Sequence, residues 1–308
     1  MELKIKDLTA LLNINEKTLL GWIREKKIPA YKINHQYHFN KTEIKEWILH
    51  NKIQVSHKIL ELVETDIPVN LTRLLEKGGI LFDIDGTLLT VDRNFNRPLL
   101  REILDGLHIN YPQMESDPFS GRTDHDIFSS FLVNHNNDPN LYLKFKETYL
   151  AKLEEQIKPE HIIRHNHIDE ALEYFSNRDF ITGLLTGNYP AAATIKLKTA
   201  NIHYDFSIGA FGEFDLDRNK LPLLAMNIIE EDYGIVPDPS KFVIIGDTPR
   251  DVLCAKHAGM KSVAVTTGKF SATELAAQEP DLILEDLSNP EIWFDRLINP
   301  VVTTSSRK

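Results

Sequence analysis

The sequence predicts an α/β protein with a three-layer core built on a parallel sheet, an inserted helical region and a small N-terminal winged helix-turn-helix domain. Three apolar runs end in polar clusters, as buried strands do when they deliver side chains to one edge of a parallel sheet. The interval between the first two runs is too long for a loop and contains helical patterns, so it predicts an insertion. Residues 1–50 differ from the rest in charge and in hydrophobic period, which predicts a separate domain.

The first run, Gly79–Phe82, is expected to be a buried strand that ends at Asp83 and Asp85. Because side chains alternate along a strand, these two acids lie on the same side. Asp83 can attack phosphorus as a carboxylate nucleophile, while Asp85 can protonate the departing oxygen and later deprotonate water. Gly86 permits a sharp turn after them. An ordinary acidic turn at a strand end is the alternative, and the other two runs decide between the two interpretations.

The second run ends in Leu184–Asn188 and the third in Val243–Asp251. Together with the first cluster, and in this order, they resemble the haloacid dehalogenase superfamily of phosphotransferases over about Gly78 to Asp286. The resemblance implies a Rossmann-like core. The second acid, Asp85, resembles the phosphatases of that superfamily, since its dehalogenases and transport ATPases lack an acid at this position.

The negative charges of the expected substrate and nucleophile predict a bound metal ion. A phosphomonoester brings negative charge to a nucleophile that is itself anionic, so the site needs compensating positive charge. Asp83 and Asp247 offer the oxygen ligands that Mg²⁺ prefers. The resemblance adds the backbone carbonyl of Asp85 as a ligand. Asp251, one turn along the next helix, supports the metal waters or the basic residue, or is an ordinary acid at a helix N-terminus.

The phosphoryl group needs further partners. Thr186 supplies a hydroxyl, and the backbone N–H groups of Gly187 and Asn188 at a helix start can hold phosphate oxygens. The family's common Lys-Pro pair is absent, and either Arg218 or Lys220 is expected to neutralise the phosphoryl group. Arg218 is favoured because its surroundings resemble a variant found in phosphoglycolate-phosphatase-like members.

The interval between Asp85 and Thr186 contains helical patterns at Leu99–Leu107 and Leu141–Leu153. Its position resembles the helical cap of the phosphoglycolate phosphatase and β-phosphoglucomutase branch, which closes over the site. Within it, Arg122 is a candidate to bind a substrate carboxylate or second phosphate. The alternative is that this segment only caps the helix that follows it.

The N-terminal region carries apolar residues at helical spacing in residues 6–12 and 16–26, separated by a short break. Residues 30–33 and 37–39 then predict a hairpin or wing, and residues 41–50 a third helix. The whole run resembles the excisionase and mercury-regulator-like family of winged helix-turn-helix DNA-binding domains.

Positive charge is concentrated in this region. Residues 1–58 contain 11 Lys and Arg against 6 Asp and Glu, whereas the remainder contains 24 against 39. A basic small domain suits duplex DNA, and the acidic body argues against nucleic acid along the rest of the chain. The candidate DNA contacts are Lys17, Arg24, Lys27, Lys32 and His35. The alternative is that the domain serves protein contacts and that these side chains are solvated surface charge.

Four parts are therefore expected, and they are residues 1–50 as the winged helix-turn-helix domain, 51–77 as a helical connector, 78–92 with 180–300 as the core, and 93–179 as the cap. No apolar run is long enough to cross a bilayer and no basic-then-apolar leader is present, so we expect a cytoplasmic protein without membrane contact. Nothing in the sequence indicates its oligomeric state.

The predicted function is a Mg²⁺-dependent phosphomonoester hydrolase that acts on a small phosphorylated metabolite through phospho-Asp83. Two alternatives remain open at this point. One is a DNA-binding regulator whose body senses a phosphorylated ligand without turning it over. The other is a phosphomutase, which differs only in whether water or a second substrate hydroxyl reaches the phospho-aspartate.

Overall fold

The computed structural model describes residues 2–12, 14–33, 36–40, 43–44, 47, 78–178, 180–213, 215–233 and 236–299. The expected connector, 51–77, and the candidate DNA contact His35 lie outside the described residues. The chain divides into a small N-terminal unit and a larger unit. In the described part of the chain, no helix combines the length and the apolar character needed to cross a membrane.

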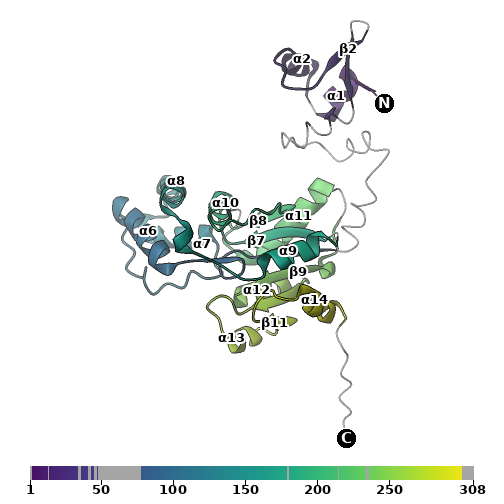
Figure 1. Cartoon of the computed structure of the whole chain (residues 1–308). Coiled ribbons are helices and arrows are strands. Elements are labelled where there is room, and N and C mark those ends of the chain that lie inside the picture. Colours follow the sequence, from purple (N-terminus) through teal and green to yellow (C-terminus); the bar gives the residue numbers. More distant parts are fainter. Residues whose placement is uncertain are drawn as a thin grey trace. The chain divides into compact units, whose positions relative to one another are not determined.

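The larger unit is built on a six-stranded parallel sheet in the order β11-β10-β9-β4-β7-β8 (Figure 1). The strands are β4 (Gly79–Phe82), β7 (Ile181–Thr186), β8 (Ile208–Phe211), β9 (Phe242–Gly246), β10 (Lys261–Val265) and β11 (Leu282–Leu284). Strand β4, which comes first in sequence among these six strands, lies inside the sheet between β7 and β9. The chain therefore delivers three separate segments to neighbouring positions at one edge.

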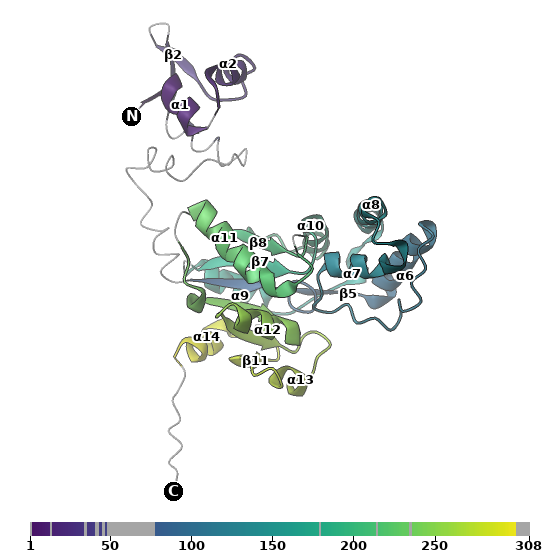
Figure 2. The same cartoon turned by 180° about the vertical axis from the view of Figure 1, so that it is seen from behind.

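Helices cover both faces of this sheet, as Figures 1 and 2 show from opposite sides. Ile80 and Phe82 face a cluster with α9 (Ile168–Ser176), α10 (Pro190–Thr199) and α14 (Pro290–Ile298). On the opposite face, Ala264 packs with residues of α12 (Pro249–His257) and α13 (Ala272–Ala276). Alternate strand residues thus enter different layers, as expected for a sheet buried on both sides. The predicted three-layer architecture is confirmed.

The long interval after β4 forms a helical region that enters and leaves through a pair of short antiparallel strands, β5 (Leu89–Val91) and β6 (Ile162–Arg164). Its helices are α6 (Arg93–Gly106), α7 (Asp124–Phe131) and α8 (Pro139–Gln156). They share a core of their own, in which the Phe128 ring meets those of Phe131, Phe145 and Tyr149. The helices expected near Leu99–Leu107 and Leu141–Leu153 are confirmed. The bounds of the expected cap, 93–179, remain a prediction. Helix α9 falls inside these bounds but packs on the main sheet.

The N-terminal unit contains α1 (Ile5–Leu11) and α2 (Glu16–Arg24), and the Asn15 side chain caps α2 by accepting from the Thr18 N–H at 2.9 Å. An antiparallel sheet follows, with β3 (Gln36–Asn40) between β1 (Glu2–Lys4) and β2 (Tyr31–Ile33). The sequence predicted the helices and the β2–β3 pair, but not β1. The core is formed by Leu8, Leu12, Leu19, Ile28, Phe39 and Ile44. Of the expected third helix, residues 43, 44 and 47 are described, and all are helical.

Candidate active site

The three polar clusters meet where β7, β4 and β9 end side by side. Asp83 follows β4, Thr186 is the last residue of β7, and Asp247 follows β9. All three line one cavity of about 800 Å³. The carboxyl edge of a parallel sheet is where this class of fold binds ligands, and the sequence predicted this convergence.

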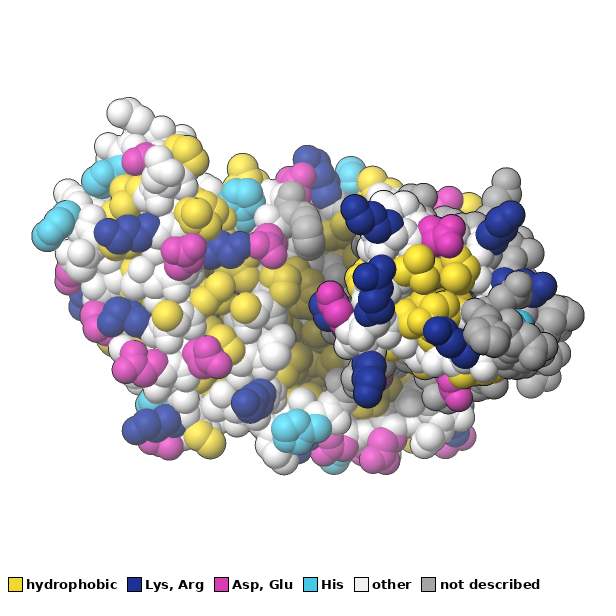
Figure 3. Space-filling model, turned by 90° about the horizontal axis from the view of Figure 1, so that it is seen from above, with side chains coloured by type: hydrophobic (Ala, Val, Ile, Leu, Met, Phe, Trp, Pro, Cys, Tyr) yellow, Lys and Arg dark blue, Asp and Glu magenta, His cyan; other side chains and the backbone are white. Residues whose placement is uncertain are grey.

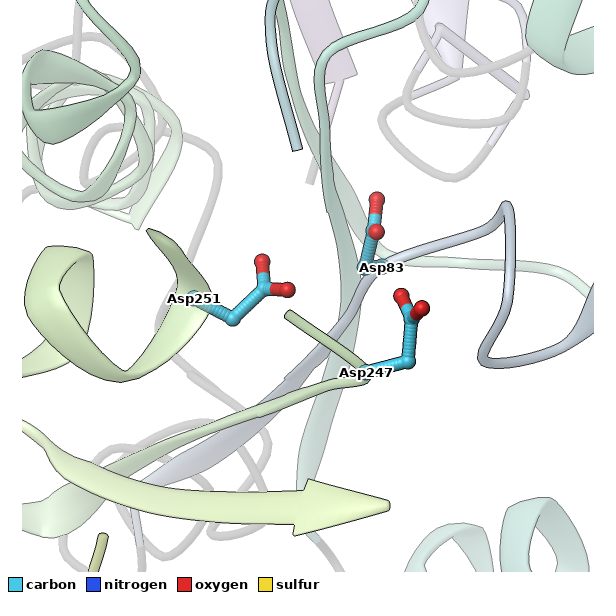
Figure 4. A group of neighbouring side chains, drawn as sticks. All are labelled: Asp83, Asp247 and Asp251. Carbon is cyan, nitrogen blue, oxygen red and sulfur yellow. The ribbon is translucent and has the colours of Figure 1, made fainter. Parts of the chain in front are cut away.

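Asp83, Asp247 and Asp251 form a buried acidic cluster whose ligand atoms all lie within 4.8 Å of one another. Figure 4 shows that two of these carboxyl groups follow strands, whereas Asp251 projects from a helix, the N-terminal turn of α12. The Arg218 guanidinium, from the short 3₁₀ turn η3 (Arg218–Lys220), lies 3.1 Å from Asp83 Oδ1 and 2.6 Å from Asp251 Oδ1. Arg218 is therefore the basic group beside the predicted nucleophile.

The cluster brings three carboxyl groups together around one guanidinium. Burial raises the pKa of Asp83 to about 6, although Arg218 opposes the shift, and burial with Asp251 and Asp83 raises the pKa of Asp247 well above its usual value. Burial alone lowers the pKa of the Arg218 guanidinium, but the charges of Asp251 and Asp83 outweigh it and raise the value. A bound cation would favour the ionised forms of Asp83 and Asp247, which burial disfavours.

The hydrogen bonds distinguish the three acids. Both oxygens of Asp251 already accept, one from Arg218 and the other from the backbone N–H and hydroxyl of Thr248 at 3.0 and 2.7 Å. Asp247 Oδ1 is buried and has no hydrogen-bond partner among the described residues. Asp83 and Asp247 therefore fit a hard cation such as Mg²⁺, while Asp251 orients Arg218. The acidic oxygens and the orphaned atom together meet the requirement for a metal site.

Gly86 brings the chain after β4 against this cluster. Its φ is +90°, and a Cβ at this position would lie 2.3 Å from the Asp247 carboxyl group. Only glycine satisfies both the backbone conformation and the close approach. The sharp turn that the sequence predicted is thus also a packing requirement of the acidic cluster.

Asp85 belongs to a second cluster. Its Oδ2 accepts from the Lys196 ammonium and from the Asn188 side-chain amide, each at 2.7 Å. The same amide donates to Thr186 Oγ1 at 2.8 Å, and its oxygen accepts from Lys196 at 2.6 Å. Because Thr186 Oγ1 acts as an acceptor here, its hydroxyl hydrogen can point to a ligand.

Sequence reasoning missed two residues of this second cluster. Lys196 stands in the buried stripe of α10 with Ala192, Ala193 and Leu197, and a lysine within an apolar helical stripe was the signal that could have found it. Asp124, at the start of α7, accepts the Tyr189 N–H at 2.9 Å and so ties the inserted region to the segment before α10. Burial raises the pKa of Asp124 to about 6, against the effect of Lys196.

Two candidates from the sequence lie apart from the acidic cluster. The Lys220 side chain is 60% exposed and pairs with Asp215 at 2.7 Å, so the structure does not bring it to the cavity. Arg122 lines the cavity, but its guanidinium binds both carboxyl oxygens of Asp117 at 3.0 Å and Asp126 at 2.6 Å. Its contact with a substrate remains a prediction. The alternative capping role of the segment is present, since Thr123 Oγ1 accepts from the Asp126 N–H at 3.1 Å.

In the N-terminal unit, Lys17, Arg24, Lys27 and Lys32 are all exposed. Lys17 and Arg24 lie on α2, and Lys32 lies on β2 with its ammonium 4.7 Å from the centre of the Tyr37 ring. Lys27 pairs with Glu25 at 2.6 Å. The surface of this unit in Figure 3 shows several Lys and Arg side chains around an apolar area.

Comparison with known proteins agrees with the division of the chain into a small N-terminal unit and a larger unit. Residues 80–265 match the family described as haloacid dehalogenase-like hydrolase, and residues 2–52 match a helix-turn-helix domain family. The pyrophosphatase PpaX of Bacillus cereus (strain AH820) is 25% identical over 224 residues, which cover 68% of this chain and 93% of the relative. PpaX of Bacillus velezensis is 27% identical over 220 residues with the same coverage. A predicted phosphatase from Clostridium acetobutylicum shares the fold, with a TM-score of 0.55 and 18% identity over 70% of this chain and 97% of that one.

Proposed function

Because the chain belongs to the haloacid dehalogenase-like hydrolase family, and is a phosphatase that carries a helix-turn-helix domain, we propose that it hydrolyses a small phosphorylated metabolite through a phospho-aspartate on Asp83. The observation that carries this proposal is the position of Asp83. Asp83 is buried at the carboxyl end of the inner strand β4. Arg218 lies 3.1 Å away, and a second acid follows two residues further along the chain.

In the first step, a carboxylate oxygen of Asp83 attacks phosphorus. The bond between phosphorus and the leaving oxygen breaks, and that oxygen takes the electron pair and a proton from Asp85. Thr186 and the nearby backbone N–H groups can hold the phosphoryl oxygens, and Arg218 stabilises the charge that develops on them.

In the second step, a water oxygen attacks phosphorus and gives its proton to Asp85, while the bond to Asp83 breaks and phosphate is released. Mg²⁺ held by Asp83 and Asp247, with the Asp85 carbonyl as a further ligand, would supply positive charge to the phosphoryl group. Asp85 thus acts as acid first and as base second.

For the N-terminal unit we propose binding to duplex DNA. The support is the helix-turn-helix family match together with four exposed basic side chains on α2 and the segments that follow it. Basic residues on such a surface can pair with DNA phosphates, and a helix of this motif enters the major groove.

A screen of phosphorylated metabolites with the full chain and Mg²⁺ tests the enzymatic proposal, with 2-phosphoglycolate, sugar phosphates and pyrophosphate tried first. Turnover should require the metal and stop on chelation. Release of phosphate containing ¹⁸O from labelled water identifies a hydrolase, whereas transfer to a second substrate hydroxyl identifies a mutase. Ligand binding without turnover of any compound would favour the sensor alternative.

A further inference from the structure

Five charged side chains are buried in the part of the chain that the structure describes. They are Asp83, Lys196, Arg218, Asp247 and Asp251. Four of them form the acidic cluster with its arginine, whereas Lys196 lies in the second cluster. Burying an ammonium group costs free energy unless it is paired and hydrogen-bonded, so its placement needs a specific partner.

That partner is Asp85. The Lys196 side chain is 7% exposed, and its Nζ lies 2.7 Å from Asp85 Oδ2 and 2.6 Å from Asn188 Oδ1. The Asn188 Nδ2 group closes the triangle by donating to the same Asp85 oxygen at 2.7 Å. The three side chains therefore fix one another.

The geometry favours one oxygen of Asp85 over the other. Oδ2 accepts two hydrogen bonds, from Lys196 and Asn188, so Oδ1 is the oxygen left to exchange a proton with a ligand. The Asp85 side chain is 40% exposed and lines the cavity, so without these bonds it would be free to rotate.

We propose that Lys196 is a positioning residue for the acid–base step, holding Asp85 so that Oδ1 faces the leaving oxygen. This inference rests on the proposed function. When the bond between phosphorus and the leaving oxygen breaks, that oxygen receives the electron pair and the proton from Asp85 Oδ1. A leaving group that is stable as an anion needs no proton, so a misplaced Asp85 harms only substrates with basic leaving groups.

Phenyl phosphate and 2,4-dinitrophenyl phosphate separate these cases, and kcat/KM reports the first chemical step for each. For Lys196→Met we expect kcat/KM to fall about 100-fold with phenyl phosphate and by less than about 5-fold with the dinitrophenyl ester. Lys196→Arg keeps the charge and should recover at least about 10-fold of the loss with phenyl phosphate. Lys198→Met, which removes an exposed lysine from the same helix, should change neither value.

Equal losses on both esters would overturn the inference, since that result indicates a structural role or direct phosphate binding by Lys196. Addition of Lys196→Met to Asp85→Asn should cause no further loss with phenyl phosphate, and additive losses would also overturn it. If Lys196→Met does not fold, as judged by circular dichroism, Lys196→Gln enters the same comparison. A wild-type protein that hydrolyses neither these esters nor any compound of the metabolite screen in Mg²⁺ counts against the proposed function itself.

Discussion

Asp83 and Asp85 are two residues apart and lie in very different surroundings. Asp83 is buried beside Arg218 and shares that guanidinium with Asp251, within reach of Asp247. Asp85 is partly exposed and pairs with Lys196. The sequence presents them as a matched pair, and the fold separates them into two electrostatic sites.

In the proposed mechanism, this difference would let one strand end supply both a nucleophile and a proton carrier. In the proposed mechanism the nucleophile attacks phosphorus beside positive charge, and the Arg218 guanidinium lies 3.1 Å from Asp83 Oδ1. The proposed proton carrier has to reach the leaving oxygen and then water, and Asp85 is partly exposed on the cavity wall. In this proposal the surroundings of the two acids, and not their residue type, assign their roles.

The strongest way to break this comparison is to neutralise each acid in turn. Asp83→Asn should abolish turnover, because the amide cannot form the phospho-aspartate, whereas Asp85→Asn should slow kcat at least ~100-fold by removing proton transfer. The kcat of each variant is measured on the best substrate from the screen. Acid-quenched turnover should trap phosphate on the wild-type protein, and peptide mapping should place it at Asp83. Near-normal activity of Asp83→Asn in Mg²⁺ would refute the assignment of the nucleophile.

The basic partners provide the next test. Arg218→Ala should lower kcat by about 100- to 1,000-fold, since it removes positive charge from the transferring phosphoryl group. Lys220→Ala is the matched control, because this exposed lysine lies two residues away and contacts Asp215. We expect it to change kcat by less than about 2-fold. The reverse ranking would move the neutralising role to Lys220.

The two units offer a coarser comparison, tested by DNA binding of the full chain. Changing Lys17, Arg24 and Lys27 together to Ala should weaken binding to duplex fragments, and should lower the slope of log K against log salt by about one per lost phosphate contact. Removal of three exposed lysines from the larger unit, at positions 144, 198 and 241, is the charge-matched control and should leave binding unchanged. Gel shifts at low and moderate salt measure both quantities. No binding by the wild-type chain at low salt would leave the N-terminal unit with protein contacts alone.

The sequence was sufficient to predict the parallel sheet and the meeting of Asp83, Thr186 and Asp247, because strand ends of one parallel sheet converge whatever separates them in the chain. The choice between Arg218 and Lys220 remained open. The two side chains leave the same short turn in different directions. Which of them points toward the acidic cluster depends on how η3 packs against α12.

Lys196 and Asp124 could not be assigned in this way. The partner of Lys196 becomes clear only in the fold, where α10 places this lysine beside Asp85, 111 positions away in sequence. Asp124 depends on contact between the inserted region and the segment before α10. Neither contact follows from strand order. The lysine in the apolar stripe of α10 indicates a buried charge but does not identify its partner, and Asp124 resembles an ordinary acid at a helix start.

The smallest expected effect concerns Asp124 and the pH dependence of the protein's stability. Its pKa is about 6 in the folded protein, raised by burial and opposed by Lys196, against about 3.9 in the unfolded chain. The folded state therefore holds the proton more tightly, so raising the pH from about 4 to about 6 costs stability, and the full penalty persists at higher pH. Asp124→Asn keeps an acceptor for the Tyr189 N–H and removes the ionisation. The unfolding free energy of this variant relative to wild type should rise by about 1–2 kcal/mol across that window, as measured by urea denaturation at each pH. Parallel curves for the two proteins from pH 4 to 7 would show that Asp124 does not titrate in this window, and would contradict this prediction.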